Sequence, residues 1–98
     1  MIIHIGDNIS LDGKDILIIL DKKSVSDSND NKNLIDNLIK SGNLVNKVDD
    51  IKSYIIVNEK NKRYSRNCKD LLKLYVSNIS SNSLFNRYKG LDRRETND

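Results

Sequence analysis

Residues 16–20 read Ile-Leu-Ile-Ile-Leu, an apolar run with no polar interruption, and this run decides how the rest of the chain is interpreted. Gly13 precedes it and Asp21 follows it. The run is too short to form a helix by itself and is rich in β-branched residues, so it predicts a strand. Because polar residues do not alternate with the apolar ones, we expect a central strand that is covered on both faces.

Further strands are predicted on both sides of this run by β-branched and apolar segments. They are residues 1–5, 9–11, 54–57 and 71–79. Glycine, aspartate and asparagine at residues 6–8 and 12–13 are turn signals between the first three strands. The strands therefore fall into an early group and a late group.

Residues 33–43 carry the clearest helical pattern in the chain. Four apolar side chains recur there at helical spacing and are expected to line one face: Leu34, Ile35, Leu38 and Ile39. Asp30 or Asn31 can cap the start of this helix, and Gly42 can end it in the left-handed conformation. We expect the polar residues 22–31 before it to form a loop.

A second helix is expected near the C-terminal end. Ser80 or Ser81 can cap its start, and Gly90 is expected to end it. Three residues share one of its faces: Leu84, Phe85 and Tyr88. This order predicts an α+β fold, with a small, mostly antiparallel sheet and two helices, one mid-chain and one C-terminal. Residues 1–90 would form a single domain and residues 91–98 a charged tail that frays.

The cellular location is predicted from the first residues and from the cysteine count. Asp7, Asp12 and Asp15 interrupt any signal-peptide core, and residues 16–20 are too few to span a bilayer. The single Cys68 cannot form an internal disulfide, which suits a reducing cytoplasm. Abundant Asn, Ile and Lys without Ala or Pro indicate AT-rich codons and a bacterial genome. We expect a cytoplasmic protein that makes no membrane contact.

No motif in the sequence indicates catalysis, metal binding or a cofactor. His4 is the only histidine and stands on a strand without a partner for acid–base chemistry. Phosphate-binding glycine loops are absent, and Cys68 has no resolving cysteine. Residues 27–38 resemble a calcium loop, but Lys32 and Leu38 replace its essential glycine and glutamate. We therefore expect no enzyme, no cofactor and no small-molecule substrate.

Charge is unevenly distributed along the chain. Residues 1–50 carry six basic and nine acidic residues, whereas residues 51–98 carry eleven basic and five acidic ones. Six of the basic residues crowd one stretch in which tyrosines are interleaved: Lys60, Lys62, Arg63, Arg66, Lys69 and Lys73. Such a density favours contact with nucleic-acid phosphates, although it also fits a solvated surface. No helix-turn-helix or zinc-finger signature accompanies it, so binding would depend on the DNA backbone and shape.

Four stretches, in order, carry a family resemblance. They are IHIGDN (residues 3–8), the apolar run that ends at Asp21, SYIIV (53–57) and YVSNISSNSLFNR (75–87). Together they resemble the bacterial extracellular matrix regulatory protein family, the RemA/RemB-like proteins. The His-Gly-Asp opening is closer to the RemB-like branch. The resemblance covers most of residues 1–21 and 53–88.

The resemblance implies a function as well as a fold. Members of this kind are expected to form ring-shaped homo-oligomers and to control biofilm matrix genes through double-stranded DNA. It places DNA contacts at Lys14 and Lys52, where arginine is common in the family; lysine still binds phosphate, but as a point charge. Residues 59–72 look like an insertion between the last two strands of the family. Three basic residues of this segment are added to the expected DNA surface: Lys62, Arg63 and Arg66.

The DNA partner expected from this is AT-rich or easily bent, because the chain offers phosphate contacts rather than base readout. The alternative is an oligomeric protein-interaction module that does not bind DNA directly. In that interpretation the basic stretch is a solvated surface, and retention on heparin would separate the two.

Overall fold

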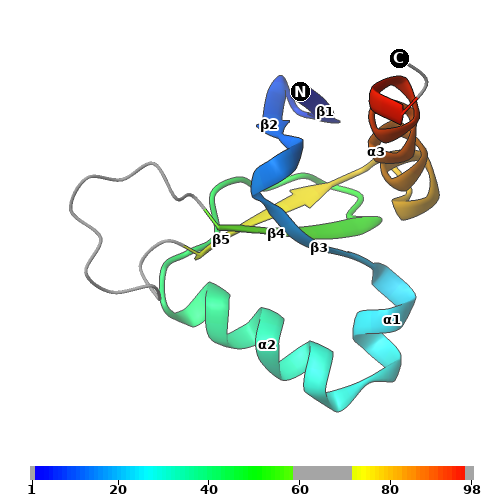
Figure 1. Cartoon of the computed structure of the whole chain (residues 1–98). Helices are drawn as coiled ribbons and strands as arrows, with labels where there is room; N and C mark the ends of the chain where they lie inside the picture. The colour runs from blue at the N-terminus through cyan, green and yellow to red at the C-terminus, as the bar shows by residue number, and fades with distance from the viewer. Residues whose placement is uncertain (1, 59–71, 97–98) are drawn as a thin grey trace.

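The structure is a computed structural model, and it describes residues 2–58 and 72–96, with residues 90–96 as backbone only. It is an α+β fold, as the sequence predicts, with antiparallel strands throughout (Figure 1). The strands are β1 (Ile2–Gly6), β2 (Ile9–Asp12), β3 (Ile16–Asp21), β4 (Ser53–Asn58) and β5 (Leu72–Ser77). The helices are α1 (Lys22–Asp27), α2 (Asn29–Lys40) and α3 (Ser81–Thr96), with a 3-10 turn at Gly13–Asp15.

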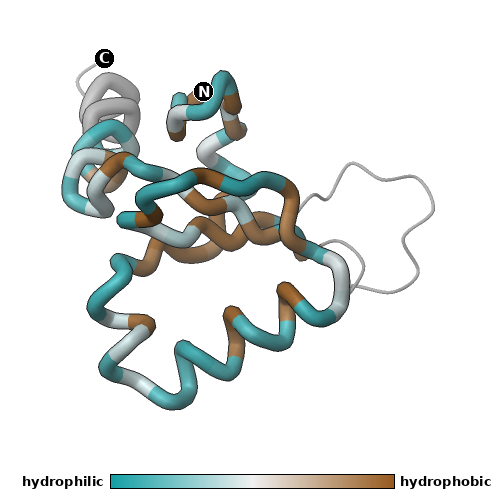
Figure 2. Tube along the Cα trace, turned by 180° about the vertical axis from the view of Figure 1, so that it is seen from behind, coloured by the Kyte–Doolittle hydropathy of each residue, from teal (hydrophilic) through white to brown (hydrophobic). Residues whose placement is uncertain are grey.

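The elements stack in three layers (Figure 1). The middle layer is a three-stranded sheet in the order β3-β4-β5, and β1 and β2 pair separately as a hairpin. The hairpin and α3 lie over one face of the sheet, and α1 and α2 lie over the other. Figure 2 shows the apolar residues gathered in the strands between these outer layers.

Each face of the sheet carries its own apolar cluster, because successive residues of β4 point to opposite sides. The cluster beneath the hairpin and α3 consists of Ile3, Ile5, Leu11, Ile55, Val57 and Leu84. The cluster against α1 and α2 consists of Val25, Ile35, Leu38, Ile56 and Leu74. The central strand is therefore β4, whose Ile55, Ile56 and Val57 are almost fully buried.

The prediction that residues 16–20 form a central, doubly covered strand is wrong. They form β3, which lies at an edge of the sheet. Leu17 is 56% exposed and Ile18 is 39% exposed. A β-bulge between Ile16 and Ile18 leaves Leu17 as the extra residue opposite β4. An unbroken apolar run thus marks an edge whose outward side is uncovered among the described residues.

The opposite edge of the sheet is covered by the chain itself. The backbone of residues 43–46 runs along β5, where Leu74 N donates to Asn43 O and Val45 N donates to Leu74 O, both at 2.9 Å. Asn46 completes this cover with its side chain: Nδ2 donates to Val76 O, and Oδ1 accepts from Val76 N, both at 2.9 Å. The side-chain amide of Asn46 thereby makes the two hydrogen bonds to Val76 that the backbone of a neighbouring strand would otherwise make.

The structure contains a third helix that the sequence interpretation missed, because residues 22–27 form α1 and α2 already begins at Asn29, where a loop was predicted. Asp21 caps α1 by accepting from Ser24 N at 2.6 Å, and Val25 is the buried residue of this short helix. Ser28 then caps α2, two or three residues before the predicted Asp30 or Asn31. The left-handed Gly42 after α2, with φ of 79°, is confirmed.

The apolar faces of the long helices are narrower than predicted. In α2 only Ile35 and Leu38 are buried, whereas Leu34 is 40% exposed and Ile39 is 44% exposed. The prediction that Gly90 ends the last helix is wrong, since α3 continues to Thr96. Whether residues 91–98 fray as a separate tail stays a prediction.

The opening hairpin and the serine-rich turn hold each other in place. Asp7 and Asn8 both have positive φ and form the two-residue loop between β1 and β2, as a type I′ turn requires. Ser77, 1% exposed, donates its hydroxyl to Ile5 O at 2.6 Å, and fully buried Ser53 donates to Ile79 O at 2.6 Å. The serines of the family-like motifs therefore satisfy buried carbonyl groups.

Candidate nucleic-acid interface

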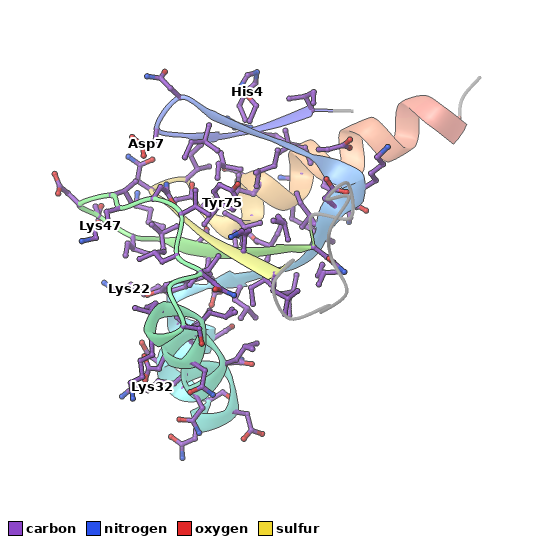
Figure 3. All side chains as sticks on the ribbon, turned by 90° about the vertical axis from the view of Figure 1, so that its left-hand side faces the viewer. His4, Asp7, Lys22, Lys32, Lys47 and Tyr75 are labelled. Atoms are coloured by element: carbon purple, nitrogen blue, oxygen red, sulfur yellow. The ribbon has the colours of Figure 1, made fainter. Side chains whose placement is uncertain are left out.

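Three lysines surround an open hollow at the end of the sheet where α3 begins. Lys22, Lys23 and Lys52 line it together with Ser80, Ser81 and Asn82. All three lysines are exposed. Figure 3 shows Lys22 extending away from the ribbon on the same side as Lys47.

Two backbone hydrogen bonds fix the positions of these lysines. Lys22 N donates to Lys52 O at 3.0 Å, and Lys52 N donates to Ser77 O at 2.8 Å. In the sheet, Asp21 is opposite Ser53, and Ser53 is opposite Ser77. The two bonds extend this strand pairing just beyond those residues. Residues 22 and 52, thirty positions apart in sequence, are thus held as neighbours by the sheet.

The start of α3 adds positive character to the same hollow. Ser80 caps the helix: its Oγ accepts from Ser83 N at 3.2 Å and its carbonyl oxygen accepts from Leu84 N at 3.1 Å. The first N–H groups of a helix lack intrahelical partners and carry partial positive charge, so they favour an anion. Three ammonium groups beside such a terminus form a surface suited to phosphate.

Two carboxylates, Asp21 and Asp50, also line the hollow. Asp21 is engaged in capping α1, and its pKa is lowered because Ser24 N donates a hydrogen bond to the carboxylate. The Ser24 side chain and the charge of Lys23 act in the same direction. Asp21 therefore mainly stabilises the start of α1, although its negative charge remains beside the lysines.

This cap predicts a specific dependence of stability on pH. A carboxyl whose pKa is lowered by folding stabilises the protein above its unfolded pKa of 3.8, and the contribution is lost as pH falls through the lower folded value. Asn at residue 21 keeps a capping oxygen but cannot titrate. We expect Asp21→Asn to flatten the fall in stability below pH 3.8, measured by urea unfolding across a pH series.

The matched control for this experiment is Asp36→Asn, which removes the same charge from the exposed surface of α2. An Asp21→Asn profile that superimposes on the wild-type profile would contradict the assignment of the cap.

The predicted DNA residues do not converge on one place. Lys52 lies in the hollow, but Lys14 lies in the 3-10 turn at the other end of β3. The six residues of β3 separate the two ends by about 17 Å. Lys14 is 74% exposed and forms a loose ion pair with Asp12 at 3.8 Å. Three other predicted residues lie outside the described residues: Lys62, Arg63 and Arg66.

Sequence interpretation missed Lys22 and Lys23 as site residues, because it assigned them to a loop. One signal was available: Asp21 directly follows the apolar run and is of a residue type that commonly caps a helix start. No sequence signal brings these lysines to Lys52, because that contact is made by strand pairing.

His4 has a structural place in the hairpin. It is exposed while Ile3 and Ile5 are buried, as strand alternation predicts. Its Nδ1 lies 2.6 Å from Ser10 Oγ, and its backbone oxygen accepts from the Arg87 guanidinium. Across residues 2–58 and 72–89, whose side chains the structure describes, no cluster of three His, Cys, Asp or Glu is placed to hold a metal ion. No helix in this part of the chain is long and apolar enough to cross a bilayer.

No protein-family model matches the chain, and no curated protein matches it.

Proposed function

We propose that this protein is a DNA-binding regulator that acts as a homo-oligomer through contacts to the phosphate backbone. The observation that supports this most is the convergence of Lys22, Lys23 and Lys52 beside the start of α3. Cations there can replace the counterions of phosphates, and release of those counterions favours binding. The resemblance to the extracellular matrix regulators adds a biological setting, the control of biofilm matrix genes by a ring-shaped assembly.

The mechanism is additive. Each protomer supplies a few phosphate contacts, and an oligomer repeats them along one duplex, so that weak contacts combine through effective concentration. Lys14, at the far end of β3, is a second contact point of the same protomer. Sequence preference then arises from how easily the DNA bends, which favours AT-rich or flexible sites.

The test is fluorescence anisotropy of a labelled AT-rich duplex of about 40 base pairs, titrated at several salt concentrations. The double variant Lys22→Ala/Lys52→Ala is expected to bind about 30-fold more weakly for each protomer engaged near physiological salt. The slope of log affinity against log salt should become shallower by about two for each such protomer. Adding Lys14→Ala to this double variant should lower the DNA affinity further, by a smaller factor.

Lys32→Ala/Lys40→Ala is the matched control, because it removes two exposed lysines from α2, away from the hollow. An equal loss in both double variants would show that only overall charge matters. Wild-type protein that fails to bind at low salt would overturn the proposal.

One observation favours the alternative of a protein-interaction module. Leu34 and Ile39 are each about two-fifths exposed on α2, on the side of the molecule away from the hairpin and α3 (Figure 1). These two side chains flank the buried stripe of Ile35 and Leu38, and exposed apolar side chains on a helix can contact another protein. Oligomeric protein that shows no DNA affinity would make this the preferred function.

A further inference from the structure

We propose that the outer edge of β3 is a self-association surface, on which a second copy of this chain pairs its own β3 antiparallel about a two-fold axis. The inference specifies one contact between copies in the homo-oligomer proposed above, and it rests on that self-association. It does not depend on whether the protein binds DNA.

The first support is that β3 has an unpaired backbone edge. On its inner side β3 pairs with β4, and no segment of residues 2–58 or 72–96 pairs with its outer side. The equivalent edge of β5 is covered by residues 43–46 and by the amide of Asn46. An open edge offers N–H and C=O groups to another strand, and proteins usually cover or charge such an edge.

The second support is the apolar character of this edge. Leu17 and Ile18 are exposed on β3, and Phe85 and Tyr88 are 50% and 37% exposed on the neighbouring face of α3. These four side chains line one shared groove. The ammonium of Lys89 lies over the Phe85 ring, with Nζ 4.9 Å from the ring centre. β3 itself carries no lysine or arginine that would discourage pairing.

The third support is charge, and it indicates that the partner is a second copy. Residues 12–15, just before β3, have a net charge of −1, whereas residues 21–23 at its end have a net charge of +1. A two-fold axis makes the two β3 strands antiparallel, so each negative end meets a positive end, twice. A parallel arrangement would bring like charges together, which is destabilising.

The bulge at Leu17 limits where the two strands pair. From Ile18 to Asp21 the register with β4 is regular, with Ile18 opposite Ile56 and Asp21 opposite Ser53. These four residues provide the straight part of the edge, and Leu17 contributes apolar contact beside it. Because the contact uses the same surface on both copies, it closes as a pair. A larger assembly requires a second, different contact.

The experiment compares full-length wild type with Leu17→Lys/Ile18→Lys by sedimentation equilibrium and native mass spectrometry. Both residues are exposed, so the fold should survive, which far-UV circular dichroism checks. Wild type should contain an even number of copies. The dissociation constant of this contact should rise at least about tenfold in the variant, because pairing would bury unpaired ammonium groups. The matched control Ile2→Lys/Val45→Lys adds the same charge to exposed apolar positions away from β3 and should associate like wild type.

Three results would overturn the proposal: wild type that stays monomeric up to about 100 µM, an assembly with an odd number of copies, or a folded β3 variant that associates like wild type. DNA anisotropy on the same samples separates the two proposals. A monomer that binds DNA contradicts the pairing and the oligomeric mechanism but leaves DNA binding in place. A pair that does not bind DNA contradicts only the DNA function.

Discussion

Replacing Leu84 with alanine is expected to lower the free energy of unfolding by about 3 kcal/mol. Leu84 is fully buried and is the α3 member of the cluster formed with the hairpin and β4. Removing its side chain loses apolar contact and leaves a cavity that the sheet cannot close. Because α3 also begins at the lysine hollow, a loosened helix would disturb that surface too.

Urea unfolding followed by circular dichroism measures this effect, and the thermal midpoint should fall by about 15 °C for a domain of this size. Asn86→Ala is the control, because residue 86 lies exposed on the same helix. Surface substitutions of this kind normally change stability by less than about 0.5 kcal/mol. A loss below about 1 kcal/mol for Leu84→Ala would mean that α3 is not held by this contact.

Asn46→Ala is expected to destabilise the fold by about 2–4 kcal/mol, from two unpaired backbone groups. The amide of Asn46 donates to Val76 O and accepts from Val76 N, so alanine leaves both groups of Val76 without these bonds. Val76 is 3% exposed, which limits how well water can replace them. The same measurement of urea unfolding applies.

Asn46→Asp sharpens the test because aspartate has nearly the same shape. A carboxylate can still accept from Val76 N, but it places a second oxygen against Val76 O instead of a donor. The loss relative to wild type should shrink as pH falls, since a protonated carboxyl can donate. The neighbouring Lys47→Ala, at an exposed position, is the control. If Asn46→Ala and Lys47→Ala have the same free energy of unfolding, the amide of Asn46 does not stabilise the fold by replacing backbone hydrogen bonds to Val76.

The strands, the hairpin turn, the end of α2 and the cap of α3 could be predicted because each depends on residues close together in sequence. Apolar β-branched runs favour extended backbone, and Gly42 accepts the positive φ that follows α2. Ser80 caps α3 from a position that the sequence identified. The prediction of a loop was wrong at α1, because this short helix is mostly polar and Val25 is its only buried residue. Local signals failed again at Gly90, because glycine weakens a helix by only about 1 kcal/mol and need not end it.

The candidate site was predictable only in part. Lys52 was identified from the family resemblance, but its neighbours Lys22 and Lys23 were not. They lie beside it because β3 and β4 pair antiparallel and end together, a contact that spans thirty residues. The same pairing places Lys14 at the opposite end of β3.

The class of the fold and the positions of its strands follow from the amino-acid sequence alone, because backbone preference and apolar patterning act over a few residues. Which strand is central depends instead on long-range packing. An apolar run has the same composition whether its outer side faces another strand or solvent, so the place of β3 depends on what packs around it. Residues 43–46 cover β5, and no described segment covers β3. That long-range choice leaves Leu17 and Ile18 exposed and gathers three lysines at one end of the sheet.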